Sequence, residues 1–199
     1  MRGLLRFGPP LAWMGVIAVL SGSLFGAERT GAWLLPLLGR LLPGASPALL
    51  HGLHAVVRKM GHLVEYGILA ALWRRALEPS RTPARAGVWA VILAALYAVV
   101  DEARQGLAPN RTPSALDVLI DTAGAILAVS CLEGEGPAAR TAVRLARWAA
   151  TAVALGSLGA ALLDWGLGLD ATDLILAALG AGAAAWGLGR AAAGRRHAA

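Results

Sequence analysis

The chain has 199 residues, of which 57% are hydrophobic and only 15% are charged. Soluble domains contain about 45–50% apolar and about 25% charged residues, so this chain has too little polar surface for a water-soluble globule. The composition excludes intrinsic disorder, which requires few apolar residues and much charge. The single cysteine, Cys131, excludes an intrachain disulfide scaffold. We therefore expect an all-α fold, a polytopic transmembrane helical bundle.

Six apolar stretches approach the roughly 20 residues that cross a bilayer core. They are Pro9–Ala27, Met60–Leu77, Ala86–Val100, Ala115–Cys131, Trp148–Leu163 and Ala171–Leu188. The first follows Arg2 and Arg6, so a cleaved signal peptide is the alternative for it. We favour an uncleaved helix, because the apolar run is long for a signal peptide and no clear cleavage site follows.

An amphipathic segment, Glu28–Arg58, connects the first two predicted spans. Its prolines are Pro36, Pro43 and Pro47. Because proline disrupts helix interiors, we expect two short amphipathic pieces, Trp33–Leu42 and Leu49–Val57, at the membrane interface or as a re-entrant segment. We expect His51 and His54 to be interfacial rather than metal ligands.

Arginine placement predicts the orientation in the membrane, because cytoplasmic loops carry an excess of Lys and Arg. Basic residues occupy the amino terminus, the second-to-third and fourth-to-fifth connections, and the carboxyl tail. These are alternate connections, which predicts six spans in the cytoplasmic (inner) membrane with both termini cytoplasmic. The net charge of +6 then reflects membrane sidedness, and we expect no nucleic-acid partner.

Ionisable residues recur at the outer ends of the second, third and fourth predicted spans. Their helical spacing places them on shared faces, and polar groups within a span usually face the bundle interior or a cavity. They are Lys59, His62, Glu65, Tyr66, Asp101, Glu102, Gln105, Asp117 and Asp121. Because each buried charge needs a partner, we expect them to converge in one polar cavity. Lys59 is the only lysine, which indicates that this position requires a compact ammonium rather than a guanidinium.

Other interpretations of these residues remain open. His62, Glu65 and Tyr66 could lie at the headgroup interface with their polar tips in water. Asp117 could be a helix cap or turn residue, whereas Asp121 lies a full turn deeper. Gly124 is best explained by close packing between helices.

Three stretches together resemble the VanZ-like family of bacterial membrane proteins. They are KMGHLVEYGIL, YAVVDEARQ and NRTPSALDVLIDTAG, in this order and spacing. The resemblance covers roughly Pro9 to Cys131 and adds Arg111 to the polar cluster, while Asp121 fits the family pattern only loosely. We therefore divide the chain into a core of about four spans, 1–135, and an appended two-span hairpin with a basic tail, 136–199.

The resemblance implies a role in the cell envelope, because the family takes its name from a protein associated with low-level teicoplanin resistance. One hypothesis is that an outward-facing polar cavity binds or modifies an envelope lipid, a cell-wall precursor or a lipoglycopeptide. In that case Lys59 and Arg111 would pair with an anionic group, while the carboxylates hold them or bind an amine.

The alternative is an intramembrane enzyme in which His62 acts as acid or base beside carboxylates, with a divalent metal as an option. A small ion-coupled transporter is less favoured. The ligand, the cofactor and any reaction stay unassigned.

Overall fold

The computed structural model describes residues 5–22, 26–107 and 114–133, separate positions between 141 and 165, and the helix at 172–194 with part of its side chains. The elements in chain order are α2 (Gly8–Leu20), α3 (Ala27–Leu41), α4 (Pro47–Leu77), the short 3-10 helix η2 (Glu78–Ser80), α5 (Pro83–Gln105), α6 (Ala115–Glu133) and α8 (Thr172–Gly194). No strand occurs among the described residues, which confirms the all-α prediction.

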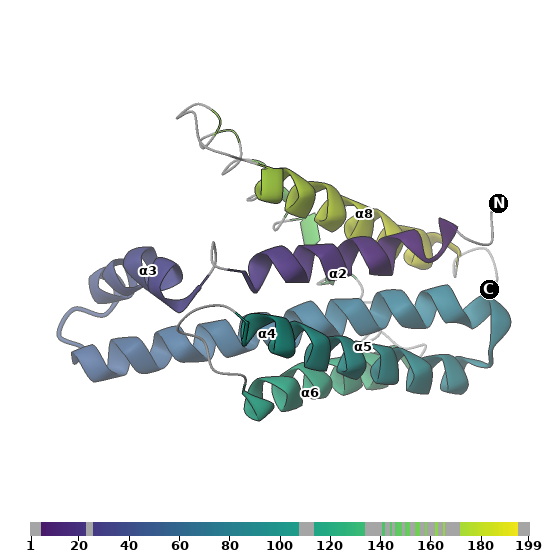
Figure 1. Cartoon of the computed structure of the whole chain (residues 1–199), viewed down its shortest axis with the longest axis horizontal. Helices are drawn as coiled ribbons and strands as arrows, with labels where there is room; N and C mark the ends of the chain where they lie inside the picture. The colour runs from purple at the N-terminus through teal and green to yellow at the C-terminus, as the bar shows by residue number, and fades with distance from the viewer. Residues whose placement is uncertain are drawn as a thin grey trace.

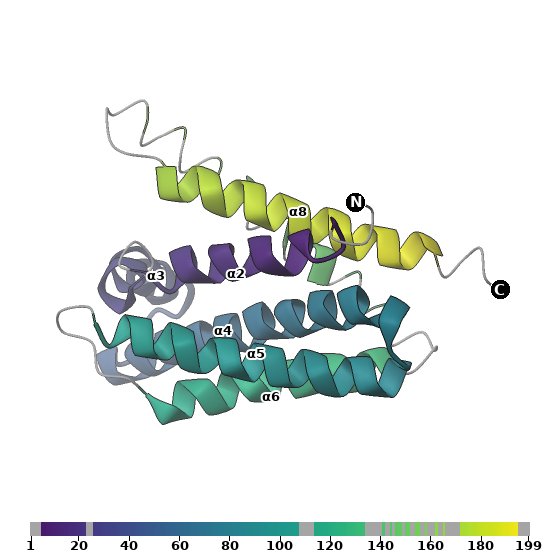
Figure 2. The same ribbon diagram turned by 45° about the vertical axis from the view of Figure 1, so that its right-hand side comes forward.

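The helices form two layers (Figures 1 and 2). Helices α4, α5 and α6 pack against one another in one layer, and α2 and α8 lie side by side in the other. Helix α2 also contacts α4, which joins the layers. Helix α3 packs on the first part of α4, and both extend beyond the ends of α2, α5 and α6 (Figure 1).

Small residues allow the helices of the core to approach closely. On α5, Ala90, Ala94 and Ala98 recur every fourth residue and are fully buried. Between α4 and α6, Gly124 lies against the backbone of Leu63, so closely that a Cβ at this position would collide with its carbonyl group. The expected role of Gly124 in helix packing is confirmed.

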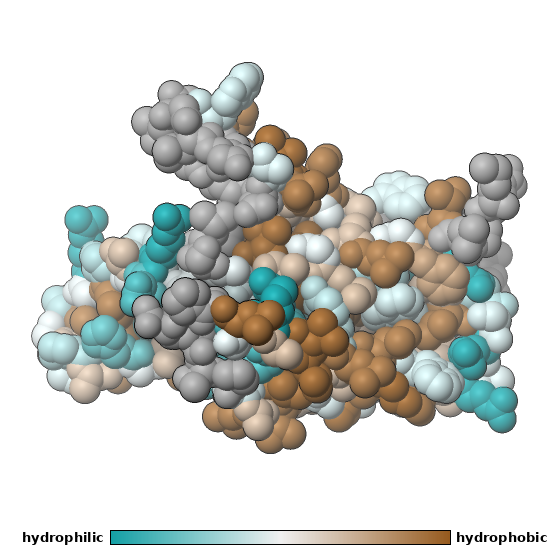
Figure 3. Space-filling model, viewed as in Figure 1, coloured by the Kyte–Doolittle hydropathy of each residue, from teal (hydrophilic) through white to brown (hydrophobic). Residues whose placement is uncertain are grey.

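The outer surface is apolar where a bilayer would contact it. Hydrophobic residues gather over the middle of the face drawn in Figure 3, and most hydrophilic ones lie toward its ends. Among the described residues, two helices are long and apolar enough to cross a membrane, Pro83–Gln105 and Ala115–Leu132. Gly8–Leu20 and Ile175–Trp186 are shorter apolar helices. The structure thus supports a membrane protein, but it does not establish six spans.

The segment between the first two predicted spans differs from the expectation. Helix α3 continues through Pro36, and Leu49–Val57 is the beginning of α4 rather than a separate piece. The reason is local: the Ser46 side chain accepts a hydrogen bond from the Leu49 amide at 3.3 Å, Pro47 occupies the first turn, and no further proline follows before Leu77.

The first and last described helices pack together. At Gly180 of α8, a Cβ would lie 2.5 Å from Val16 Cγ2 and 2.7 Å from the carbonyl oxygen of Ala12, so this crossing also depends on glycine. Residues beyond 135 therefore contribute directly to the surroundings of α2. The predicted division at residue 135 remains a prediction, because much of 134–171 lies outside the described residues.

Candidate functional site

A pocket lies at the end of the bundle where α2 and α5 finish and α3 covers α4. It encloses about 190 Å³. Its lining residues are Leu20, Ser21, Thr30, Trp33, Leu34, Val57, Arg58, Gly61, His62, Glu65 and Gln105. The lining combines apolar side chains with a few convergent polar groups, the usual character of a ligand site.

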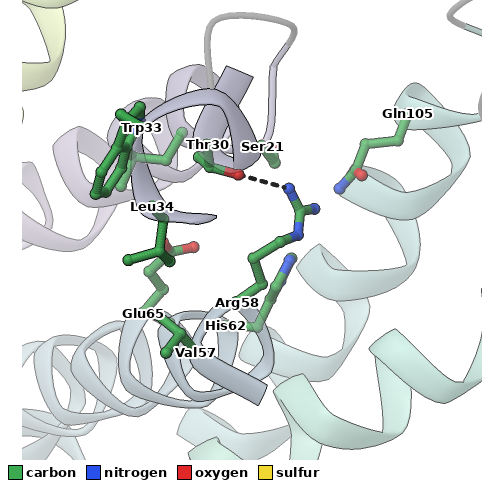
Figure 4. Close-up of a pocket in the computed structure, with 11 residues that line it drawn as sticks. Ser21, Thr30, Trp33, Leu34, Val57, Arg58, His62, Glu65 and Gln105 are labelled. Carbon is green, nitrogen blue, oxygen red and sulfur yellow. Dashed lines mark hydrogen bonds between the residues drawn. The ribbon is translucent and has the colours of Figure 1, made fainter. Parts of the chain in front are cut away.

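Three ionisable residues of α4 reach this pocket because of their helical spacing. Arg58, His62 and Glu65 stand at i, i+4 and i+7, which places them on one face of the helix. In Figure 4, Arg58 and His62 point to one side of the pocket, whereas Glu65 lies on the other side beside Leu34. The pocket therefore presents positive and negative groups on different walls.

The side chains of Arg58 and Glu65 differ in their protein partners. Arg58 Nη1 lies 3.5 Å from the hydroxyl oxygen of Thr30, to which it donates. Within the described part of the chain, the carboxylate of Glu65 makes no hydrogen bond or ion pair, although its backbone carbonyl accepts one from Trp13 Nε1 at 2.8 Å. Its carboxylate is thus available to a ligand in the pocket.

One ion pair and one contact between a histidine and a carboxylate connect α4 to α6 beside the pocket. Lys59 Nζ donates to Asp117 Oδ1 at 2.7 Å, and both side chains are partly exposed. One turn deeper, His62 Nδ1 and Asp121 Oδ1 lie 3.3 Å apart, and Asp121 is almost fully buried. His62 therefore faces the pocket while a carboxylate stands behind it.

Asp101 is the centre of a buried hydrogen-bond network that joins α2 to α5. Its Oδ1 accepts from Ser21 Oγ and from Arg104 Nη2, both at 2.8 Å, and its Oδ2 accepts from Gln105 Nε2 at 2.9 Å. The same Arg104 nitrogen donates to the carbonyl oxygen of Ala18 at 3.0 Å. Asp101 is only 2% exposed, so it supports the pocket wall from behind rather than lining the pocket.

Glu102 holds the beginning of α6. Its carboxylate accepts a hydrogen bond from the backbone N–H of Ser114, directly before the helix. The Ser114 hydroxyl in turn accepts from the Asp117 amide at 3.3 Å, as an N-cap does. Glu102 therefore positions α6 relative to α5.

The remaining predicted members have other positions. Tyr66 is fully buried in the core, where its ring lies 6.3 Å from that of Tyr97. Arg111 lies outside the described residues. The structure thus arranges the predicted set around the pocket, across the α4–α6 contact and within the core, instead of around a single opening.

Helix α3 is attached to α4 through His54. The hydroxyl of Thr30 lies 3.0 Å from His54 Nε2, and His54 is 7% exposed. Burial, followed by the nearby charges of Arg58 and His51, lowers the pKa of His54 below its usual 6.5. A neutral imidazole therefore suits this contact.

A metal centre finds no support in the described ranges, where no three His, Cys, Asp or Glu side chains are grouped so that they could hold an ion. The acid–base chemistry available at the pocket is that of His62 and Glu65, and its ion-pairing chemistry is that of Arg58 and Glu65.

Several residues of the site were not among the sequence-predicted candidates. Arg58 was detectable, since it shares the i, i+4, i+7 pattern with His62 and Glu65. Ser21, Thr30 and Arg104 gave no such signal, because their roles depend on partners from distant helices.

Comparison with known families agrees with this architecture. A family model described as VanZ/LLP1 matches residues 12–133, which includes most of α2, all of α3 to α6 and every described pocket residue. No curated protein and no solved structure matches the chain. The family match covers more than half of the 199 residues, and the chain belongs to the VanZ/LLP1 family of membrane proteins.

Proposed function

We propose that the protein binds a component of the bacterial envelope in the pocket between α2, α3, α4 and α5. The ligand class is an envelope lipid, a cell-wall precursor or the lipid-bearing part of a lipoglycopeptide. Binding such a molecule could lower susceptibility to teicoplanin-type antibiotics, either by retaining the drug or by altering its target. We place the protein in the cytoplasmic membrane with about six spans, both termini inside and the pocket at the outer face.

The observation that carries the proposal is the combination of groups around this pocket. Arg58 and Glu65 offer opposite charges, and the Glu65 carboxylate has no hydrogen bond or ion pair within the described ranges. Trp33 and Val57 are 61% and 49% exposed at its rim. A charged interior with an apolar rim, on a membrane protein, fits an amphiphilic molecule.

The amphipathic helix α3 supports placement of the pocket near the membrane surface. Leu34 faces α4, while Trp33, Leu37 and Leu41 form an exposed apolar stripe at four-residue spacing. Arg29 and Arg40 lie next to this stripe on the helix. Helices of this kind lie in the interface with their apolar face in lipid, and tryptophan prefers that depth.

A catalytic role is the second candidate, and one observation favours it. His62 Nδ1 and Asp121 Oδ1 lie 3.3 Å apart without a hydrogen bond between them, and a carboxylate this close to an imidazole can assist proton transfer. Within the described chain, Ser21 and Thr30 are the hydroxyls at the pocket, and both already hydrogen-bond to other residues. No activated nucleophile is therefore evident there, and binding is the better-supported function.

The proposal is tested by comparing cells that express wild-type protein, Glu65→Gln or no protein. Teicoplanin susceptibility and the composition of lipids and cell-wall intermediates are measured at equal membrane levels of protein. We expect Glu65→Gln to behave like cells without the protein. The matched control is Glu78→Gln in η2, directly after the opposite end of α4, where the amide oxygen can still face Arg74 Nε; it should behave as wild type.

Two outcomes separate the candidate functions. A chemically altered envelope species that disappears in His62→Gln would establish catalysis instead of binding. If Glu65→Gln and wild type have the same phenotype and the same envelope composition, the pocket is not the functional site.

A further inference from the structure

The charges in the pocket favour a ligand that carries both a positive and a negative group. Arg58 stands on one side and Glu65 on the other, seven residues apart on α4. Seven helical residues correspond to a rise of about 10 Å along the axis, which the long arginine side chain can partly span. A purely anionic group would meet the Glu65 carboxylate at close range, and a purely cationic one would meet Arg58.

The size of the pocket limits the bound group further. At about 190 Å³ it is smaller than the roughly 300–1,000 Å³ typical of sites for drug-sized ligands. It can accommodate a lipid headgroup but not the peptide core of a glycopeptide. The exposed apolar side chains at its rim, Val57 on α4 and Trp33 on α3, provide a surface for an attached acyl chain.

We infer that the pocket recognises a zwitterionic headgroup, a phosphate next to a primary ammonium, on a membrane lipid. The guanidinium of Arg58 suits the phosphate because its planar fork donates several hydrogen bonds. Gln105 extends toward this guanidinium from α5 (Figure 4), and its side-chain amide can donate a hydrogen bond to the same phosphate. The Glu65 carboxylate accepts from the ammonium. This inference rests on the proposed binding function and specifies its ligand.

The test measures lipid binding to the purified full chain by native mass spectrometry. The probes are phosphatidylethanolamine, which carries phosphate and ammonium, and phosphatidylglycerol, which carries phosphate alone, with matched acyl chains. Wild type should retain phosphatidylethanolamine with about tenfold or higher preference, because only this lipid offers an ammonium that can donate a charge-assisted hydrogen bond to Glu65.

Two variants divide the recognition into its parts. Glu65→Gln should abolish the preference for phosphatidylethanolamine while phosphatidylglycerol binding is retained, and Arg58→Gln should weaken both lipids. The controls Glu78→Gln and Arg85→Gln make the same changes at the opposite end of the bundle and should leave the preference intact.

Three outcomes would overturn the inference. Equal binding of the two lipids by wild type would exclude recognition of an ammonium. Preserved preference in Glu65→Gln would place the recognition elsewhere. Competition by soluble phosphoethanolamine as effective as that by the intact lipid would identify a free headgroup rather than a lipid as the ligand. In each case a loss of phenotype in Glu65→Gln cells would still support the proposed envelope function, so the two failures are distinguishable.

Discussion

The carbonyl group of Leu63 on α4 occupies the space that a side chain on Gly124 of α6 would require. Glycine is therefore necessary where these two helices cross, one turn from the His62–Asp121 pair. The crossing fixes the distance between the helices, and with it the position of the carboxylates that stand behind the pocket.

Replacement of Gly124 by alanine should separate α4 from α6. We expect a loss of about 1–3 kcal/mol in the free energy of unfolding, because backbone rather than a flexible side chain must move. Unfolding in detergent monitored by circular dichroism checks this. The control is Gly15→Ala, where a Cβ meets no atom within 4 Å and helix propensity favours alanine. Equal stability of the two variants would contradict the close crossing.

Asp101→Asn should act on stability more than on ligand selectivity. The substitution removes the charge that Arg104, Ser21 and Gln105 surround. Because Asp101 is buried but the Arg104 side chain is 43% exposed, we expect a loss of about 1–3 kcal/mol in the free energy of unfolding. Thermal unfolding in detergent should therefore shift to lower temperature, whereas Glu65→Gln should leave it nearly unchanged. A variant as stable as wild type would mean that the network does not hold α2 to α5.

Lys59 and Asp117 should make only a small contribution to stability. Their side chains are 44% and 29% exposed, and ion pairs of this kind contribute about 0.2–1 kcal/mol. A double-mutant cycle with Lys59→Gln and Asp117→Asn measures the coupling energy. A coupling well above this range would show that the pair is far less accessible to water than the structure indicates.

The contact between α3 and α4 should weaken in acid. Because the pKa of His54 is lowered in the folded protein, the detached or unfolded state binds protons more readily. The stabilising effect of the neutral imidazole is therefore complete above pH 6.5 and is lost as the pH falls through the lowered value. NMR titration of His54, assigned with His54→Gln, should give a pKa below 6.5, and amide exchange in α3 should accelerate over the same range. A pKa at or above 6.5 would contradict the buried contact.

Hydropathy and spacing along the chain predicted most helices of the core. The third and fourth predicted spans correspond to α5 and α6, and Gly124 was identified as a packing residue. The prediction that Leu49–Val57 is a short piece separate from the next span was wrong. Both belong to α4, which begins at Pro47 because proline is tolerated at the first turn of a helix and Ser46 caps that turn. Helix α2, at 13 residues, is also shorter than the stretch predicted from Pro9 to Ala27.

The candidate site could be predicted only in part. The helical pattern located His62 and Glu65 on α4, and both line the pocket. It could not show that Asp101 and Glu102, adjacent in sequence, serve different neighbours: Asp101 the end of α2, and Glu102 the beginning of α6. Such assignments depend on how helices far apart in the chain pack together, and periodicity along one helix contains no information about that.

The central claim is that an envelope molecule occupies the pocket at the rim formed by Trp33. The most direct measurement is photocrosslinking in living cells, with benzoylphenylalanine at Trp33 or, as control, at Trp89, an exposed tryptophan of α5. We predict a discrete adduct at position 33, identified by mass spectrometry as an amphiphilic envelope component, that is lost with Arg58→Gln and is absent at position 89. Identical bulk-lipid adducts at both positions, unchanged by Arg58→Gln, would contradict the account.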